Sequence, residues 1–200
     1  MKLSMPAVSL CAAAVFALLT THAPAQAAAT AYSGATDVTL SSSLTGSLSA
    51  LGVKVGYDHP AMFSGTTATF PIVTGVIDLK TSAGSLLHSG ALTFDAQSDA
   101  TKVRLQAFVI STASKPPVLS AVVVVNNAVW GRYNVFDLTL PAGTTLPLKP
   151  TGNTLMLKGV KLTLDPSMSA MLNKVYGVSQ FTPGFDVGSA NVTANVDNNQ

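Results

Sequence analysis

The sequence has few residues that are suited to covalent or metal chemistry. It contains a single cysteine, Cys11, three histidines, one tryptophan and no glutamate, and only 10% of its residues are charged. About 25% is usual for a soluble domain. Polarity comes instead from Ser, Thr and Asn, so the composition predicts a chain that works by packing and binding rather than by charge.

The first 27 residues have the pattern of a secretory signal. One positive charge, Lys2, precedes an apolar run from Ala7 to Leu19, and Ala25-Gln26-Ala27 provides an A-x-A cleavage pattern. The apolar run is too short to span a bilayer as a helix, which needs about 20 residues. We therefore expect an exported protein, periplasmic or extracellular, with residues 1–27 as signal peptide and residues 28–200 as one domain.

Removal of this segment changes what the rest of the chain can do. Cys11 is lost, so neither a disulfide nor a thiolate ligand is available. Ten basic and nine acidic side chains remain, without a cluster of Lys or Arg. We expect neither nucleic acid nor an anionic membrane as a partner, and no span or anchor in the mature protein.

The hydrophobic pattern is typical of β-strands. Residues 101–110 alternate, with Val103, Leu105 and Val109 on one face and Lys102 and Arg104 on the other. Residues 118–125 are almost continuously apolar, which predicts a strand covered on both faces. Further strands are expected at 68–72, 76–80, 85–94, 134–140, 154–164 and 187–196. Seven to nine strands predict a mainly β fold, an antiparallel β-sandwich or barrel-like sheet.

Two segments have the period of short helices instead. Asp165 is a suitable N-cap, Pro166 suits the first helical position, and Gly177 suits the C-terminal stop of a helix over about 166–176. A second, weaker helix is expected over about 42–51, where leucines recur at helical spacing and Gly46 lowers the propensity. In both segments the end of a strand is followed by a helix cap, a short helix and a glycine that ends the helix. This similarity indicates either a duplicated strand-helix unit or two similar helices that close the β domain.

The central part of the chain resembles a known family. The run 68–78 (ATFPIVTGVID), then Gly84, then 88–94 (HSGALTF), is similar to the signature of the HtaA-type haem-binding domain of exported bacterial proteins, and 162–176 resembles its late helix ending near a tyrosine. The resemblance covers most of the mature chain and implies a β domain that binds haem. In that family an axial tyrosinate near the first helix and a histidine in a Gly-His-Asp-Gly-like turn are expected.

This chain departs from the family at both positions. Residues 47–51 (SLSAL) hold no tyrosine, and residues 95–99 (DAQSD) hold no histidine. The remaining candidate ligand-binding residues are Tyr57 and His59, two apart in a loop, and Tyr176. His88 shares its predicted strand face with apolar residues, which favours a core histidine over a ligand.

The sequence offers no basis for catalysis. No Gly-x-Ser-x-Gly elbow accompanies the histidines, no pair of aspartates stands out for glycoside hydrolysis, and no ligand spacing suggests a zinc site. We expect a non-enzymatic protein and no metal site. Two functions remain open: a binding module for haem or another small hydrophobic or planar ligand, and a structural or interaction module that contacts protein or polysaccharide.

Overall fold

The computed structural model describes residues 28–98 and 100–197, so the predicted signal segment lies outside the described residues. Two helices interrupt the strands, α1 (Ser42–Ala50) and α2 (Pro166–Tyr176). The strands are β1 (Ala28–Leu40), β2 (Val53–Asp58), β3 (Met62–Ser64), β4 (Thr67–Asp78), β5 (Gly84–His88), β6 (Ala91–Ala96), β7 (Lys102–Ser111), β8 (Val118–Val125), β9 (Ala128–Thr139), β10 (Thr154–Leu164) and β11 (Asp186–Asp197). The predicted mainly β class is confirmed.

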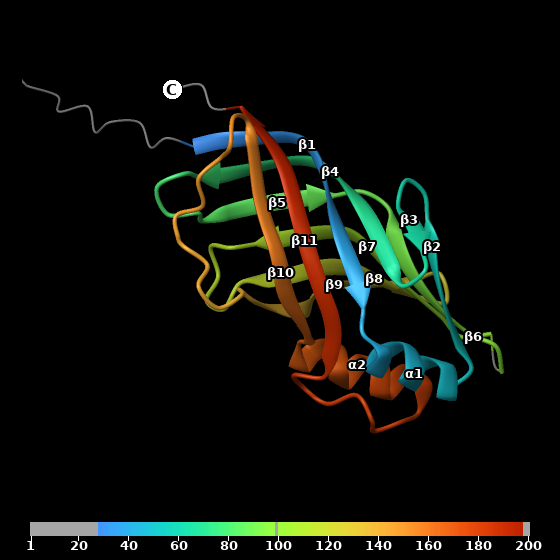
Figure 1. Ribbon diagram of the computed structural model, residues 1–200. Coiled ribbons are helices and arrows are strands. Elements are labelled where there is room, and N and C mark those ends of the chain that lie inside the picture. The colour runs from blue at the N-terminus through green and yellow to red at the C-terminus, as the bar shows by residue number, and fades with distance from the viewer. Residues whose placement is uncertain (1–27, 99, 198–200) are drawn as a thin grey trace, which may run out of the picture.

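Eight of the strands close into an antiparallel barrel. Their order is β7-β5-β4-β1-β11-β10-β9-β8, and β8 pairs back with β7. Figure 1 shows β10, β11 and β1 crossing the front of the barrel. Of the two architectures predicted from the sequence, the structure is therefore the barrel-like sheet.

Alternating burial explains the closure. In β8 the side chains of Leu119, Ala121, Val123 and Val125 are buried inside the barrel, and the intervening ones are half-buried outside. The expectation that this strand is covered on both faces is thus wrong for its outer face. An antiparallel sheet with one wet face needs only one apolar side chain in two.

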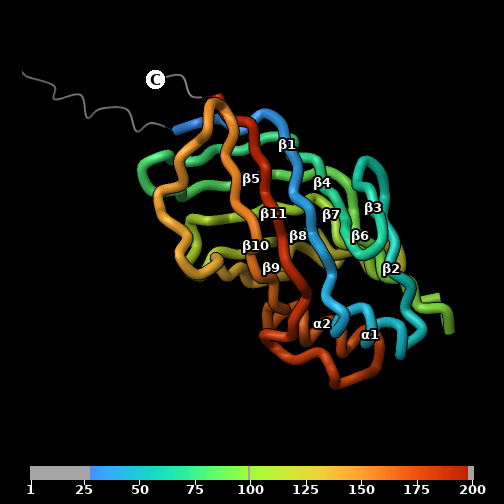
Figure 2. The backbone as a smooth tube through the Cα atoms, in the orientation of Figure 1, coloured from blue at the N-terminus to red at the C-terminus, as the bar shows by residue number. Residues whose placement is uncertain are grey.

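The sheet divides where β5 ends. β7 pairs with β5 through residues 109–111 and with β6 through residues 102–106, and a bulge at Ala107, whose φ is 52°, separates the two stretches. β6 continues outward to pair with β2. We call β2, β6, the first half of β7 and the end of β8 the side sheet; Figure 2 shows it extending from the barrel beside β3 and β4.

Both helices cover one end of the molecule, as Figure 1 shows. Ser41 caps α1 by accepting a bond from the Leu44 N–H at 3.1 Å, and Asp165 caps α2 by accepting one from the Ser167 N–H at 2.7 Å. Gly177 ends α2 in the left-handed conformation. Both predicted helices are confirmed, and the strands before them, β1 and β10, both pair with β11.

Several predicted strand boundaries are wrong. The segments 68–72 and 76–78 belong to the single strand β4, which ends two residues before the predicted boundary at 80, and 85–94 divides into β5 and β6 at Ser89-Gly90. Gly90 has a φ of 90°, and a Cβ there would lie 2.5 Å from the Ala61 nitrogen. This close packing against a distant loop, rather than any local pattern, ends the strand.

Candidate functional site

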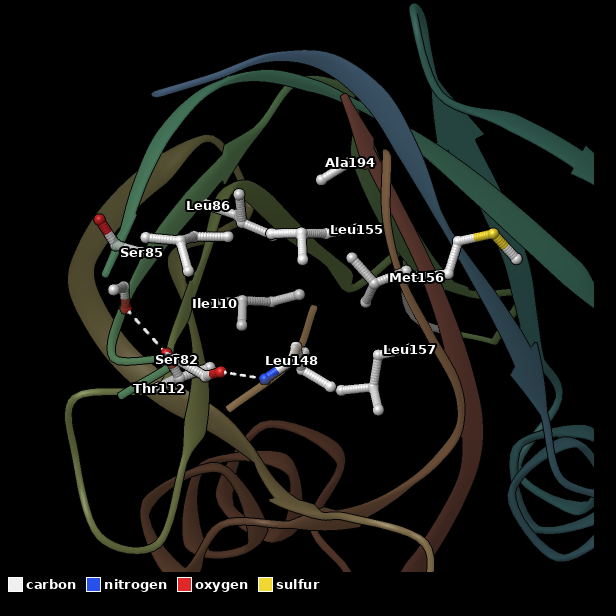
Figure 3. A pocket seen from close by; sticks show the side chains of 13 residues that line it. Ser82, Ser85, Leu86, Ile110, Thr112, Leu148, Leu155, Met156, Leu157 and Ala194 are labelled. Atoms are coloured by element: carbon white, nitrogen blue, oxygen red, sulfur yellow. Dashed lines mark hydrogen bonds between the residues drawn. The ribbon is translucent and has the colours of Figure 1, made fainter. Parts of the chain in front are cut away.

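The barrel interior holds only small spaces. The cavity in Figure 3 encloses about 60 Å³ and lies among apolar side chains such as Leu86, Ile110 and Leu155. Ser82 closes its edge, where its hydroxyl accepts a bond from the Leu148 N–H at 2.6 Å. Ligand pockets usually enclose about 300 Å³ or more. The interior of the barrel therefore does not fit haem.

His88 lies in the core, on the apolar face that the pattern predicted. Only 5% of its surface is exposed, its Nε2 lies 2.8 Å from Thr36 Oγ1, and its Nδ1 has no hydrogen-bond partner. The adjoining space is only about 10 Å³. Burial lowers the pKa of His88 to about 4, and backbone groups of Phe108 and Leu86 oppose this effect without reversing it. His88 is therefore neutral at pH 7.

Tyr176 is half-buried at the end of α2. Its hydroxyl donates a hydrogen bond to the Phe94 carbonyl at 3.1 Å, which joins the helix to β6. This bond requires the phenol proton. Tyr176 and His88 thus lie in separate places, each within the packed interior rather than in an open site.

Tyr57 and His59, by contrast, lie next to each other at the surface. Their ring centroids are 5.9 Å apart at 77°, an edge-to-face arrangement, and Tyr57 stacks on Phe63 at 6.4 Å and 21°. Tyr57 is 41% exposed. The turn that joins β2 to β3 brings the three rings together. We call Tyr57, His59 and Phe63 the aromatic cluster.

A hollow of about 540 Å³ lies on the side sheet beside this cluster. Its size is within the range of small-molecule sites. Strand register arranges the residues that line it: Lys54 pairs with Asp95, which pairs with Lys102, and Gly56 pairs with Thr93, which pairs with Arg104. Tyr57 and Phe63 complete the lining, together with Val55, Asp58, Val103, Val124 and Asn127. We call this hollow the groove.

Gly56 leaves the middle of the groove open. A Cβ at this position would lie 2.7 Å from Thr93 Oγ1, so any side chain here would press on the opposite strand. Three cations and two carboxylates surround this open middle. Arg104 Nε contacts Asp58 Oδ2 at 2.7 Å, with both side chains nearly half exposed. Such an ion pair is weak and exchanges partners readily.

The sequence predicted the closeness of Tyr57 and His59 but not the cationic side of the groove. Lys54, Lys102, Arg104 and Thr93 meet through the pairing of β2 with β6 and of β6 with β7. The alternation in residues 101–110 already placed Lys102 and Arg104 on the wet face. No local pattern indicated which other strands would lie beside them.

Other types of site are not found in the described ranges. Within residues 28–98 and 100–197, no three His, Cys, Asp or Glu side chains are placed to hold a metal ion together. The two helices of the described part are too short or too polar to cross a membrane.

The eight-stranded antiparallel barrel with two closing helices and a side sheet defines a known class of fold. The C-terminal domain of HtaA from Corynebacterium glutamicum has this fold, with a TM-score of 0.68 at 16% identity, covering 84% of this chain and 99% of that domain. The N-terminal domain of HtaA from the same organism matches with a TM-score of 0.61 at 10% identity, covering 84% of this chain and 98% of that domain.

A third solved structure, the heme-binding protein HtaB from Corynebacterium glutamicum, matches with a TM-score of 0.57 at 10% identity, over 85% of this chain and 95% of that one. No family model and no curated protein matches the sequence. The resemblance to HtaA-type domains is confirmed at the level of the fold. At these identities the likeness shows the fold alone, and a shared fold does not define a ligand.

Proposed function

We propose that the protein is an exported, non-enzymatic binding module that holds a planar, anionic small ligand in the groove of the side sheet, with haem as the first candidate. The observation that carries this proposal is the placement of the aromatic cluster beside a 540 Å³ hollow that three cations line. The hollow is several times larger than the apolar spaces of about 60, 30 and 10 Å³ inside the barrel.

The aromatic cluster suits a flat ring. Tyr57 and Phe63 offer stacked ring faces, and such faces bind planar groups through dispersion and quadrupole interactions of about 0.5–1.5 kcal/mol for each pair. A ligand without a ring face would use little of this surface. The cluster therefore favours an aromatic or macrocyclic ligand over a flexible chain.

The cations suit acidic groups on the same ligand. Lys54 and Lys102 flank Asp95 across the strands, and Arg104 shares its guanidinium with Asp58. A carboxylate entering the groove replaces Asp58 as the partner of Arg104 without leaving a buried charge, since both side chains are solvated. Arginine is also well matched to carboxylates in its planar geometry.

The groove fits haem in these respects, and the interior does not. The propionates of haem would face Lys54, Lys102 and Arg104, and its ring would lie against the aromatic cluster. Tyrosinate and imidazole both ligate haem iron in proteins, and Tyr57 and His59 are the residues here that supply them at the surface. The described heme-binding protein of the same fold supports this choice of first ligand.

A haemin titration of the purified protein tests the proposal through a saturable Soret shift. Tyr57→Phe removes the phenol oxygen while keeping the ring, and Tyr32→Phe is its matched control at an exposed tyrosine of β1. Lys54→Gln removes a cation from the groove, and Lys158→Gln, at an exposed lysine of β10, is its matched control. We expect both groove variants to weaken binding about tenfold or more and both controls to leave it unchanged. Absence of a saturable shift would refute haem binding in the groove.

One further observation favours the alternative of an interaction module. Val73, Val76 and Leu87 are exposed on the outer faces of β4 and β5, and Tyr32 is exposed on the neighbouring β1. Exposed apolar patches on a sheet are typical of protein contact surfaces. If haemin does not bind, substitution of these residues by Thr and a measurement of self-association or surface attachment tests this second role.

A further inference from the structure

His88 lies where the barrel meets the side sheet. It is the last residue of β5, and Ser89-Gly90 then lead directly into β6, whose outer face lines the groove. Across from it, β4 changes register between Ile72 and Thr74. Any movement of His88 therefore acts at the point where the sheet divides.

The surroundings of His88 do not accommodate a positive charge. The other residues that line its cavity come from six strands: Thr36 and Val38 (β1), Phe70 (β4), Leu92 (β6), Phe108 (β7), Leu119 (β8) and Phe136 (β9). None of these side chains is titratable. Protonation would therefore leave an imidazolium in a largely apolar space, where the Thr36 hydroxyl and the backbone groups of Phe108 and Leu86 offset only part of the cost of burying the charge, which disfavours the closed structure.

A packed contact connects this position to the groove. Gly90, two residues beyond His88, lies so close to the buried Ala61 that a Cβ on it would be 2.5 Å from both the Ala61 nitrogen and its Cβ. Ala61 in turn donates its N–H to the Asp58 carbonyl at 3.1 Å, closing the turn that carries His59. The segment 88–90 thus supports the loop that positions the aromatic cluster.

We propose that His88 is an acid-sensitive regulator of the groove: its protonation loosens segment 88–90 from Ala61, disorders the aromatic cluster and releases the bound ligand. The release step rests on the proposed function, whereas the loosening does not. The charged groups of the groove, Arg104 and Asp58 among them, lie outside the His88 cavity and do not stabilise the imidazolium.

Amide hydrogen exchange of the whole protein, read by mass spectrometry, tests the loosening directly. Wild type and His88→Gln are compared at pH 7.5 and pH 5, after correction for intrinsic exchange rates. We expect segments 58–63 and 88–92 to open roughly 30-fold more in the wild type than in the variant at pH 5, and equally at pH 7.5, since an opened His88 titrates near 6.5. Segment 190–194 of β11 is the internal reference.

Equal exchange of the two proteins in these segments at pH 5 would overturn the proposal. Should the variant not fold, NMR titration of the His88 ring in the wild type decides instead, because a midpoint near 6.5 contradicts it and a midpoint near 4 with concurrent loosening supports it. Haemin binding then tests the release: between pH 7.5 and pH 3.5 the wild type should lose roughly fourfold more affinity than the variant, because most of His88 is protonated only below its folded-state pKa of about 4. Absence of haemin binding at pH 7.5 would refute haem binding in the groove but not the acid-induced loosening, because the loosening is measured by hydrogen exchange or NMR without any ligand.

Discussion

The barrel and the side sheet share parts of β7 and β8 but enclose different kinds of space. Inside the barrel, side chains such as Leu105, Leu162 and Val196 are fully buried, and the spaces left are about 60 Å³ or less. On the side sheet the same alternation places Lys54, Arg104 and Asp95 around an open groove. One face of each side-sheet strand is thus buried against the core while the other lines the groove in which we propose that the ligand binds, so substitutions on the two faces should have separable effects.

The largest expected difference is between two glycines. At Gly188 of β11, where φ is 136°, a Cβ would lie 2.0 Å from the Thr39 carbonyl oxygen, so Gly188→Ala should reduce the free energy of unfolding by about 3 kcal/mol or more. At Gly56 the nearest atom is the movable Thr93 hydroxyl, so Gly56→Ala should cost about 1 kcal/mol while narrowing the groove. Urea unfolding measures both, and similar losses would contradict the separation of the two regions.

Removal of a core side chain should come next in size. Leu162 of β10 is fully buried, so Leu162→Ala leaves a cavity and should cost about 3 kcal/mol of unfolding free energy. Ligand binding by the folded fraction should not change. Met156→Ala, at a half-exposed position of the same strand, is the control and should cost less than about 1 kcal/mol.

Acid should lower stability mainly through His88, which lies at the junction of the barrel and the side sheet. The pKa of His88 is about 4 in the folded protein, below the ordinary 6.5, so the unfolded chain binds the proton first as the pH falls. Stability from neutral His88 is complete above pH 6.5 and decreases between pH 6.5 and 4. We expect the unfolding free energy of the wild type, measured by urea unfolding, to be about 2 kcal/mol lower at pH 5 than above pH 6.5. The variant His88→Gln should not show this loss, whereas the control His59→Gln, at an exposed site, should show it in full.

The smallest expected effect on stability belongs to the groove. Arg104 and Asp58 are both nearly half exposed, so Arg104→Gln should change the unfolding free energy by less than about 0.5 kcal/mol. The same variant should weaken haemin binding severalfold if the propionates face this side of the groove. A large loss of stability with unchanged binding would show that Arg104 serves the fold instead.

The sequence was most informative where one local pattern determines the structure. Alternation predicted β7, although the bulge at Ala107 buries Phe108 and Ile110 where the pattern had placed Val109 inside, and the cap and stop residues Asp165 and Gly177 predicted α2. It failed for β1, whose residues (AATAYSGATDVTL) are small and polar and become a central strand only through pairing with β4 and β11. The same reason explains the site: Tyr57 and His59 are neighbours in the chain, whereas Arg104 reaches Asp58 only because β6 lies between their strands.

Closure of the barrel also determines where the described sheet can join another chain. Pairing of β7 with β8 leaves four strand edges without a neighbour in the described sheet: those of β2, of β3, of the first half of β9 and of the first half of β10. α1 lies next to β2 and α2 next to β9, and Lys54 and Arg132 add charge at these strands. Helices and charged side chains at an edge oppose edge-to-edge addition of further strands. The two short helices thereby oppose the addition of another strand at two of the four open edges, those of β2 and β9.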